Sequence, residues 1–136
     1  MEREGSTLLK QTNFLIDNNN LTGYTQAFAE FNIQTGQIER RYEYGDDLTA
    51  QVAYSASPLS PSYFLYDGLG STRSLTDSAG IITQACNYQP FGETIEPPQD
   101  YSTNHLFTGE YFDENLDYYY LRARYYAPGT GRFTGF

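Results

Sequence analysis

A tyrosine that recurs at nearly constant spacing constrains the fold of this chain more than any other feature. Tyr24, Tyr44, Tyr66, Tyr88 and Tyr111 are separated by about 20 to 23 residues, and a glycine usually follows within a few positions. Two strands of about 5–6 residues with their turns occupy that length. The repeating unit is therefore predicted to be one β-hairpin. Because a single hairpin is only marginally stable in water, such units must stack on neighbours and share a core.

Short runs of alternating apolar and polar residues, separated by turn residues, predict an all-β fold, an array of antiparallel β-hairpins. The clearest hairpin joins residues 72–76 to residues 81–84 through a turn in which Gly80 adopts positive φ. A second joins residues 24–33 to residues 38–44. The prolines at 58 and 61, and at 97 and 98, place loops at residues 55–62 and 96–102.

Two of the predicted strands have faces that can be assigned from their alternation. In the strand at residues 24–33, one face carries Ala27, Ala29, Phe31 and Ile33. A third strand is predicted over residues 118–126. One of its faces carries Tyr119, Leu121, Ala123 and Tyr125, and the other carries Arg122 and Arg124, which can lie over neighbouring tyrosines.

The charge of the chain disfavours several classes of partner. Seventeen acidic against eight basic residues give a formal net charge of -9, which repels phosphate backbones and anionic lipid surfaces. No window is apolar enough for a membrane span, and residues 1–6 lack the apolar core of a signal peptide. We therefore expect neither nucleic-acid binding nor membrane insertion.

Two ordered runs of residues resemble the Rhs repeat-associated core of YD-repeat proteins. The first run comprises Tyr66, Asp67, Gly70, Ser71, Arg73, Asp77, Gly80, Tyr88, Pro90, Phe91 and Gly92. The second comprises Phe107, Gly109, Asp113, Tyr119, Tyr120, Leu121, Arg122, Ala123, Arg124, Tyr125, Tyr126, Gly131, Arg132 and Phe133. Residues 21–24 and 42–45 look like ordinary preceding repeats. The resemblance covers nearly the entire chain.

The resemblance implies a section of a long spiral of β-hairpins that closes into a hollow shell. In bacterial members such a shell holds a variable carboxy-terminal toxin, and in teneurins it is part of an adhesion protein. Residues 1–60 would be YD-type hairpin repeats, and residues 61–136 would be the core region. The implied role is structural, without catalysis, cofactor or metal, and the implied partners are the remaining shell repeats and a toxin or other cargo. The parent protein would be secreted or displayed on a cell surface.

The resemblance also has gaps. In many bacterial members an Asp-Pro segment that supports self-cleavage follows the position of Phe136, so we expect a fragment truncated at both ends. The family usually has arginine at Glu110, proline at Glu114, glycine at Asp117 and aspartate at Ala127. Without glycine at Asp117, the turn there must be reshaped, since a residue with a side chain pays for positive φ.

Several residues could instead carry chemistry. Asp67 and Asp77 could pair as an aspartic protease, although aspartates in such turns usually bond their own backbone. Asp113, Asn115 and Asp117 match the first positions of a calcium loop, but Tyr118 and Arg124 occupy places that require glycine and glutamate. We interpret that run as a hairpin turn.

His105 is the only histidine and Cys86 the only cysteine, and the sequence supplies no partners for either in catalysis. A surface or loop position is expected for His105, and an inert thiol in an apolar strand for Cys86. The strongest rival to the structural role is a carbohydrate-binding or cell-surface-binding face built from exposed tyrosines. In a stacked hairpin array the same tyrosines serve as core and as cross-strand pairs, which we favour.

Overall fold

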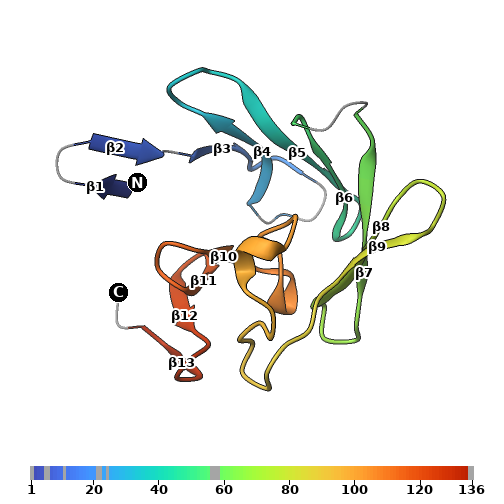
Figure 1. Ribbon diagram of the computed structural model, residues 1–136, viewed down its shortest axis with the longest axis vertical. Coiled ribbons are helices and arrows are strands. Elements are labelled where there is room, and N and C mark those ends of the chain that lie inside the picture. The colour runs from blue at the N-terminus through green and yellow to red at the C-terminus, as the bar shows by residue number, and fades with distance from the viewer. Residues whose placement is uncertain are drawn as a thin grey trace. The chain divides into compact units, whose positions relative to one another are not determined.

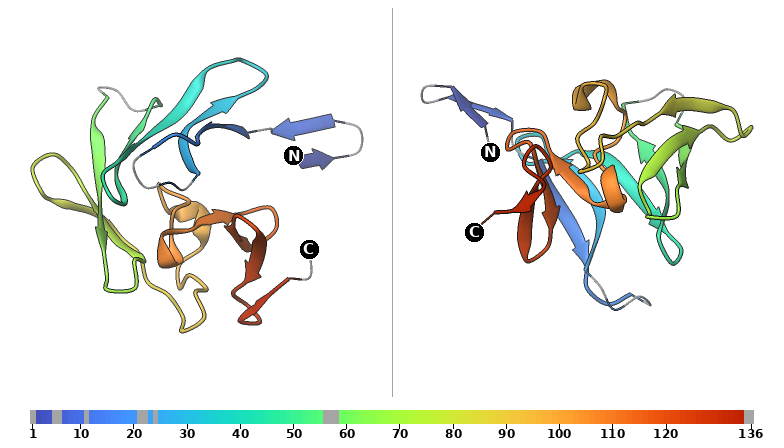
Figure 2. Two further views of the ribbon diagram at one scale, coloured as in Figure 1. Left: turned by 180° about the vertical axis from the view of Figure 1, so that it is seen from behind. Right: turned by 90° about the horizontal axis from the view of Figure 1, so that it is seen from below.

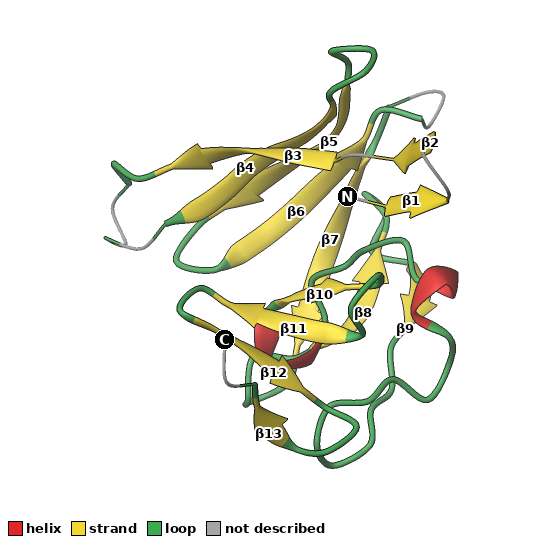
Figure 3. Ribbon diagram, turned by 90° about the vertical axis from the view of Figure 1, so that its left-hand side faces the viewer, coloured by secondary structure: helices red, strands yellow, loops and turns green. Residues whose placement is uncertain are grey.

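The computed structural model describes residues 2–4, 7–10, 12–20, 23, 25–55 and 59–134. The chain divides into two compact units, Met1–Tyr63 and Phe64–Phe136. In the described residues, antiparallel strands and two short 3-10 turns make up the regular structure, so the predicted all-β fold is confirmed (Figures 1 and 3). None of the helical segments in this described part is long and apolar enough to cross a membrane.

The first unit is an antiparallel meander of hairpins. Its strands are β1 (Glu2–Glu4), β2 (Thr7–Lys10), β3 (Thr12–Asp17), β4 (Gln26–Asn32), β5 (Ile38–Tyr44), β6 (Leu48–Ala53) and the first half of β7 (Pro61–Tyr66). Strands β1 and β2 pair with each other, and β3 to β7 pair in chain order. Figure 2 shows β3 to β6 running side by side from two further directions.

The second unit begins within β7 and contains two sheets. Its other elements are β8 (Thr72–Thr76), β9 (Ile82–Ala85), η1 (Pro98–Asp100), η2 (Phe107–Gly109), β10 (Tyr111–Asp113), β11 (Tyr118–Leu121), β12 (Arg124–Ala127) and β13 (Arg132–Phe133). In one sheet β8 follows β7 and pairs with β9, and in the other the order is β10-β11-β12-β13.

The predicted hairpin over residues 72–84 is confirmed as β8 and β9. Its turn closes through the N–H of Gly80, which donates to the carbonyl of Asp77 at 3.1 Å. Gly80 has φ +81°, and the ladder shifts register between Leu75 and Thr76. The second predicted hairpin is also formed, by β4 and β5, while Tyr24 and the adjacent Leu21 and Thr22 lie outside the described residues.

The prediction of one continuous strand over residues 118–126 is wrong. The chain reverses at Arg122, which has φ +59°, and the N–H of Ala123 bonds the carbonyl of Leu121 at 2.7 Å. Strands β11 and β12 are therefore two arms of a hairpin, with Tyr119 opposite Tyr126 and Tyr120 opposite Tyr125. Paired residues share a face, so Tyr125 lies on the opposite face from Tyr119.

Two smaller predictions also need correction. In β4, the pairing with β3 skips Phe28, and this extra residue breaks the alternation, so Ala27 does not continue the face of Ala29. The predicted loop at residues 55–62 ends earlier, since Pro61 is the first residue of β7. A proline is tolerated at that position because the first residue of a strand need not donate to the ladder.

The repeating tyrosines anchor each unit to its own backbone. The hydroxyl of Tyr44 donates to the carbonyl of Ala27 at 2.8 Å, and the hydroxyl of Tyr88 donates to the carbonyl of Thr72 at 2.6 Å. The two partners lie 17 and 16 residues upstream, respectively, which is nearly the same offset. Two of the recurring tyrosines, Tyr44 and Tyr88, thus make the same kind of hydrogen bond to an upstream strand.

Polar groups occupy part of the core of the first unit. Tyr42 is buried between β4 and β6 and donates its hydroxyl to the carboxylate of Glu30, which also lies 3.8 Å from the guanidinium of Arg40. Burial and the neighbouring Glu30 raise the pKa of Tyr42 well above its usual value. The buried carboxylate is therefore supplied with a hydrogen bond and a cation, as buried charges require.

Candidate functional site

The first signature turn, residues 66–73, is organised by one aspartate. The carboxylate of Asp67 accepts hydrogen bonds from the N–H groups of Leu69 at 3.0 Å and Ser71 at 3.1 Å. Its second oxygen accepts from Nε of Arg73 at 2.9 Å. Partial burial acts to raise the pKa of Asp67, but the Ser71 and Arg73 hydrogen bonds outweigh it and lower that pKa. As predicted, Asp67 is a turn residue bonded to its own backbone.

The second signature turn, residues 105–111, contains the 3-10 turn η2. The N–H of Gly109 donates to the carbonyl of Leu106 at 3.0 Å, and the N–H of Leu106 donates to the carbonyl of Glu110 at 3.0 Å. Thr108 adopts φ +55°. This conformation is unfavourable for a residue with a Cβ, so the surrounding contacts must hold it in place.

These two signature turns interlock. The N–H of Thr72 donates to the carbonyl of Leu106 at 3.1 Å, and its hydroxyl donates to the carbonyl of His105 at 2.8 Å. In the opposite direction, the N–H of Thr108 donates to Oγ of Ser71 at 2.9 Å. Ser71 and Thr72 are almost fully buried. Three hydrogen bonds in a buried contact therefore join segments that are more than thirty residues apart.

A third segment, the signature loop at residues 87–95, is held against the same region by two tyrosines. The hydroxyl of Tyr119 donates to the carbonyl of Gly92 at 2.9 Å, and the hydroxyl of Tyr126 donates to the carbonyl of Phe91 at 2.7 Å. Gly92 has φ +100°, and a Cβ placed on it would lie 2.4 Å from Cδ1 of Phe107. Only glycine allows the loop to approach the Phe107 ring this closely.

The sheet behind these turns carries an aromatic ladder of one residue per strand, Phe112, Tyr119, Tyr126 and Phe133. Successive ring centroids lie 4.9, 6.5 and 5.6 Å apart. Aromatic pairs at such separations add stability beyond the area they bury. Phe112 and Tyr119 join a buried core cluster with Cys86, Tyr101 and Leu106.

Burial perturbs the titratable groups of this core. Desolvation, with smaller contributions from the Cys86 thiol and neighbouring tyrosines, raises the pKa of Tyr88 and of Tyr119 well above the usual tyrosine value. Desolvation and the nearby Glu96 raise the pKa of the Cys86 thiol to about 11. The thiol is therefore protonated at neutral pH, and a protonated thiol is a poor nucleophile. The predicted inertness of Cys86 agrees with this environment.

The tyrosines divide between core and surface. Tyr42, Tyr101 and Tyr119 are buried, whereas Tyr63 of the first unit and Tyr120 of the second are 38% and 44% exposed. The core role that the sequence favoured thus holds for some tyrosines and not for others.

His105 was expected at a surface or loop position; it does lie outside the named strands, between η1 and η2, but the surface position is wrong. Its side chain is buried, and its ring packs edge-on against the ring of Tyr111 at 5.6 Å between centroids. The interlock accounts for this burial, because the His105 carbonyl accepts a hydrogen bond from the hydroxyl of Thr72, which is itself buried.

The predicted placement of arginines over tyrosines is also wrong for β12. The guanidinium of Arg124 lies 4.0 Å from the centroid of the Phe133 ring. The turn at residues 128–131 explains the difference, since it brings β13 and its Phe133 beside β12. An arginine does lie over a tyrosine elsewhere, where Arg73 is 5.5 Å from the ring centroid of Tyr88.

The candidate catalytic and calcium-binding groups are used in turns. The carboxylate of Asp77 accepts from the N–H groups of Ala79 at 2.9 Å and Ile81 at 3.0 Å. The carboxylate of Asp113 likewise accepts from the N–H of Asn115 at 2.9 Å, and Asp117 adopts φ +57°, the strained turn predicted from its missing glycine. Across the part of the chain that the structure describes, no group of three or more His, Cys, Asp or Glu could hold a metal ion.

Sequence reasoning assigned no role to several residues that build the interlock and the core cluster beside it. They are Thr72, Tyr101, His105, Leu106, Thr108 and Phe112. Each contributes a backbone group, a hydroxyl or a buried side chain to a contact with a distant segment, and such contacts leave no pattern in a single sequence. The other predicted signature residues Pro90, Tyr120, Leu121, Ala123, Gly131 and Arg132 lie in the same unit, in the turns and strands around this region.

Comparisons with known proteins extend this picture, although no family model matches the chain. It is 26% identical over 127 residues to the tRNA nuclease WapA of Bacillus subtilis, covering 91% of this chain and 5% of that protein. It is 38% identical over 72 residues to salivary gland surface protein 1 of Aedes aegypti, covering 51% of this chain and 2% of that protein. The chain thus spans a small part of the curated relatives it matches.

A solved structure decides the fold. The crystal structure of TcdB2-TccC3 superimposes with a TM-score of 0.54 and 18% sequence identity, covering 97% of this chain and 8% of that chain. The same complex without its hypervariable C-terminal region gives a TM-score of 0.55 at 17% identity. The chain has the fold of an Rhs/YD-repeat shell segment. The interlocked turns are the structural feature that the signature residues of this chain build.

Proposed function

We propose that this YD-repeat segment is a section of a larger shell that encloses or positions a toxin or other cargo, and that the segment performs no catalysis. The interlock carries the proposal. The signature side chains form hydrogen bonds within turns, pack in the core and fix three distant segments to one another, which is what a wall must do to withstand an enclosed load. In this proposal residues 1–60 are hairpin repeats and residues 61–136 are the core region.

The names of the relatives support the identity of the partners. One relative is a tRNA nuclease, and the solved neighbour has a hypervariable C-terminal region, so we propose a variable toxin, for instance a nuclease, as cargo. The remaining partners would be further repeats of a secreted or cell-surface parent. Because the net charge of -9 repels phosphate, we propose that the segment itself binds no nucleic acid.

A graft tests the shell role. The matching segment of the TcdB2-TccC3 shell is replaced by this chain, and the C-terminal region of the graft is challenged with added protease. A shell section keeps that region protected to the extent seen in the unaltered complex. Loss of protection in a graft that still shows β-sheet circular dichroism would contradict the shell role.

The absence of catalysis has its own test. The intact mass of the purified chain is followed over days, beside that of an Asp67→Asn, Asp77→Asn double variant. We expect no cleavage product in either. A fragment that appears in the unaltered chain and not in the variant would establish the aspartic-protease alternative instead.

A further inference from the structure

We propose that the second unit binds an extended, basic polypeptide segment in an open groove beside strand β13. The groove has a volume of about 1020 Å³, at the upper end of the roughly 300–1,000 Å³ that ligand pockets occupy. This inference deepens the proposed function, on which it rests for the source of the polypeptide. The packing of the core does not account for this groove, because the side chains of the core fill the interior and leave no need for a hollow at the surface.

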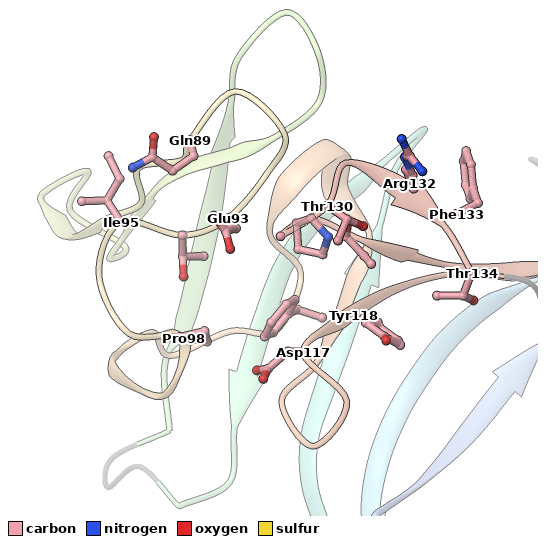
Figure 4. A pocket seen from close by; sticks show the side chains of 15 residues that line it. Gln89, Glu93, Ile95, Pro98, Asp117, Tyr118, Thr130, Arg132, Phe133 and Thr134 are labelled. Atoms are coloured by element: carbon pink, nitrogen blue, oxygen red, sulfur yellow. The ribbon is translucent and has the colours of Figure 1, made fainter.

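The walls of the groove come from two preformed pieces of structure. Figure 4 shows Gln89, Glu93 and Ile95 on one side and Arg132, Phe133 and Thr134 on the other. The first wall is a small hairpin, in which the N–H of Gln89 donates to the carbonyl of Glu93 at 2.7 Å. A groove with fixed walls costs a ligand little ordering of the protein.

One wall offers an open strand edge. Within the described residues, β13 is the last strand of its sheet. The N–H of Thr134 points inward and donates to the carbonyl of Tyr125 at 2.9 Å. Because successive residues of a strand direct their backbone groups to opposite sides, the N–H and C=O of Phe133 point away from β12. An added strand pairs with such groups.

The side chain of Phe133 supports the same occupant. Its ring lines the groove and is 47% exposed. The guanidinium of Arg124, 4.0 Å from the ring centroid, stacks on it and holds its orientation. Ile95 on the opposite wall, together with Pro98 and Ala127, adds further apolar lining for the side chains of an extended chain.

Charge selects a basic occupant. The groove is lined by two carboxylates, Glu93 and Asp117, and by one cation, Arg132, and a second cation, Arg124, stacks on the lining ring of Phe133. The whole second unit, residues 64–136, carries nine acidic and four basic residues, a net charge of -5. This field attracts lysine and arginine side chains and repels acidic ones. Sugars also bind between aromatic rings and carboxylates, but they have no peptide backbone to pair with a strand edge. The open edge therefore favours a polypeptide.

Three synthetic octapeptides test the proposal on the 136-residue chain. One alternates lysine with valine, the second replaces each lysine by glutamate, and the third is the lysine peptide N-methylated at alternate amides. We expect the first to bind at least tenfold more tightly than the other two in fluorescence anisotropy. In proton-nitrogen NMR, the amide signals of Phe133, Thr134 and Thr94 should shift. Equal affinity of all three, or shifts confined to other residues, would overturn the proposal.

A matched pair of variants tests the charge argument. Glu93→Gln removes a carboxylate from the groove, and Asp46→Asn removes one from an exposed turn of the first unit. A surface charge pair predicts weakening of the lysine peptide by about two- to fivefold for E93Q. D46N should leave its affinity unchanged, and equal effects of the two variants would refute a local site.

The remaining outcomes are also decisive. If cellohexaose shifts the groove amides and the lysine peptide does not, the groove is a carbohydrate site and the polypeptide proposal fails. Failure of peptide binding leaves the graft experiment to decide the shell role independently. Conversely, a graft that loses cargo protection while the isolated chain still binds the lysine peptide would refute the shell and retain the groove.

Discussion

Replacing Gly92 by alanine should break the contact between the signature loop and the second signature turn. A Cβ on Gly92 would lie 2.4, 2.7 and 2.9 Å from three ring atoms of Phe107. That ring packs against the buried core, so it has little room to move. Overpacking of this kind costs about 1–3 kcal/mol. The φ of +100° adds a backbone cost of about 1–2 kcal/mol for a residue with a Cβ. The expected destabilisation is therefore about 2–5 kcal/mol.

Urea unfolding followed by circular dichroism measures this loss of stability. Gly80→Ala is the matched control, since Gly80 lies in the same unit with φ +81° and nothing within 4 Å of its added Cβ. The control carries only the backbone cost, so the difference between the two variants isolates the Phe107 contact at about 1–3 kcal/mol. If both variants lose the same stability, the Phe107 ring moves aside without cost, and its contact with Gly92 is not tightly packed.

Three further predictions concern the same core. The buried thiol of Cys86 has its pKa raised to about 11, so it should resist a thiol reagent at pH 8 in the folded chain and react fully in urea. Rapid reaction of the folded chain would contradict its burial. Tyr119→Phe leaves the Gly92 carbonyl without its donor and should cost about 1–3 kcal/mol in urea unfolding, whereas Tyr120→Phe at a 44% exposed site should change little. Burial and the hydrogen bond to Glu96 raise the pKa of Tyr101 from 10.0 to about 12, so its contribution to stability is complete below pH 10 and is lost as pH rises toward 12; unfolding curves that do not change between pH 10 and 12 would contradict this.

The turns of this protein were predictable because their chemistry is local. Asp67 and Asp77 each bond N–H groups within four residues, and Gly80 supplies positive φ in the same short segment. Such preferences act between residues that are adjacent in every conformation of the chain, so a sequence pattern reveals them. The strained turn at Asp117 followed from the same reasoning, through the absence of a glycine.

The candidate site was predictable only in part. The signature residues were recognised as a set, but their contacts join the second signature turn to Ser71 and Thr72, 33 to 37 residues away. The reversal at Arg122 was missed because an arginine carries no turn signal, and the ladder of β11, β12 and β13 holds it in place.

The sequence by itself determined the all-β class, the hairpin period and the turns organised by Asp67 and by Asp77 and Gly80. It did so because the tyrosine spacing and turn residues act within one repeat. Only the tertiary structure decided that His105 is buried, that Arg124 stacks on Phe133, and that Gly92 must remain glycine. Those outcomes depend on which distant segments share a core, and packing free energy, which no local propensity encodes, selects that arrangement.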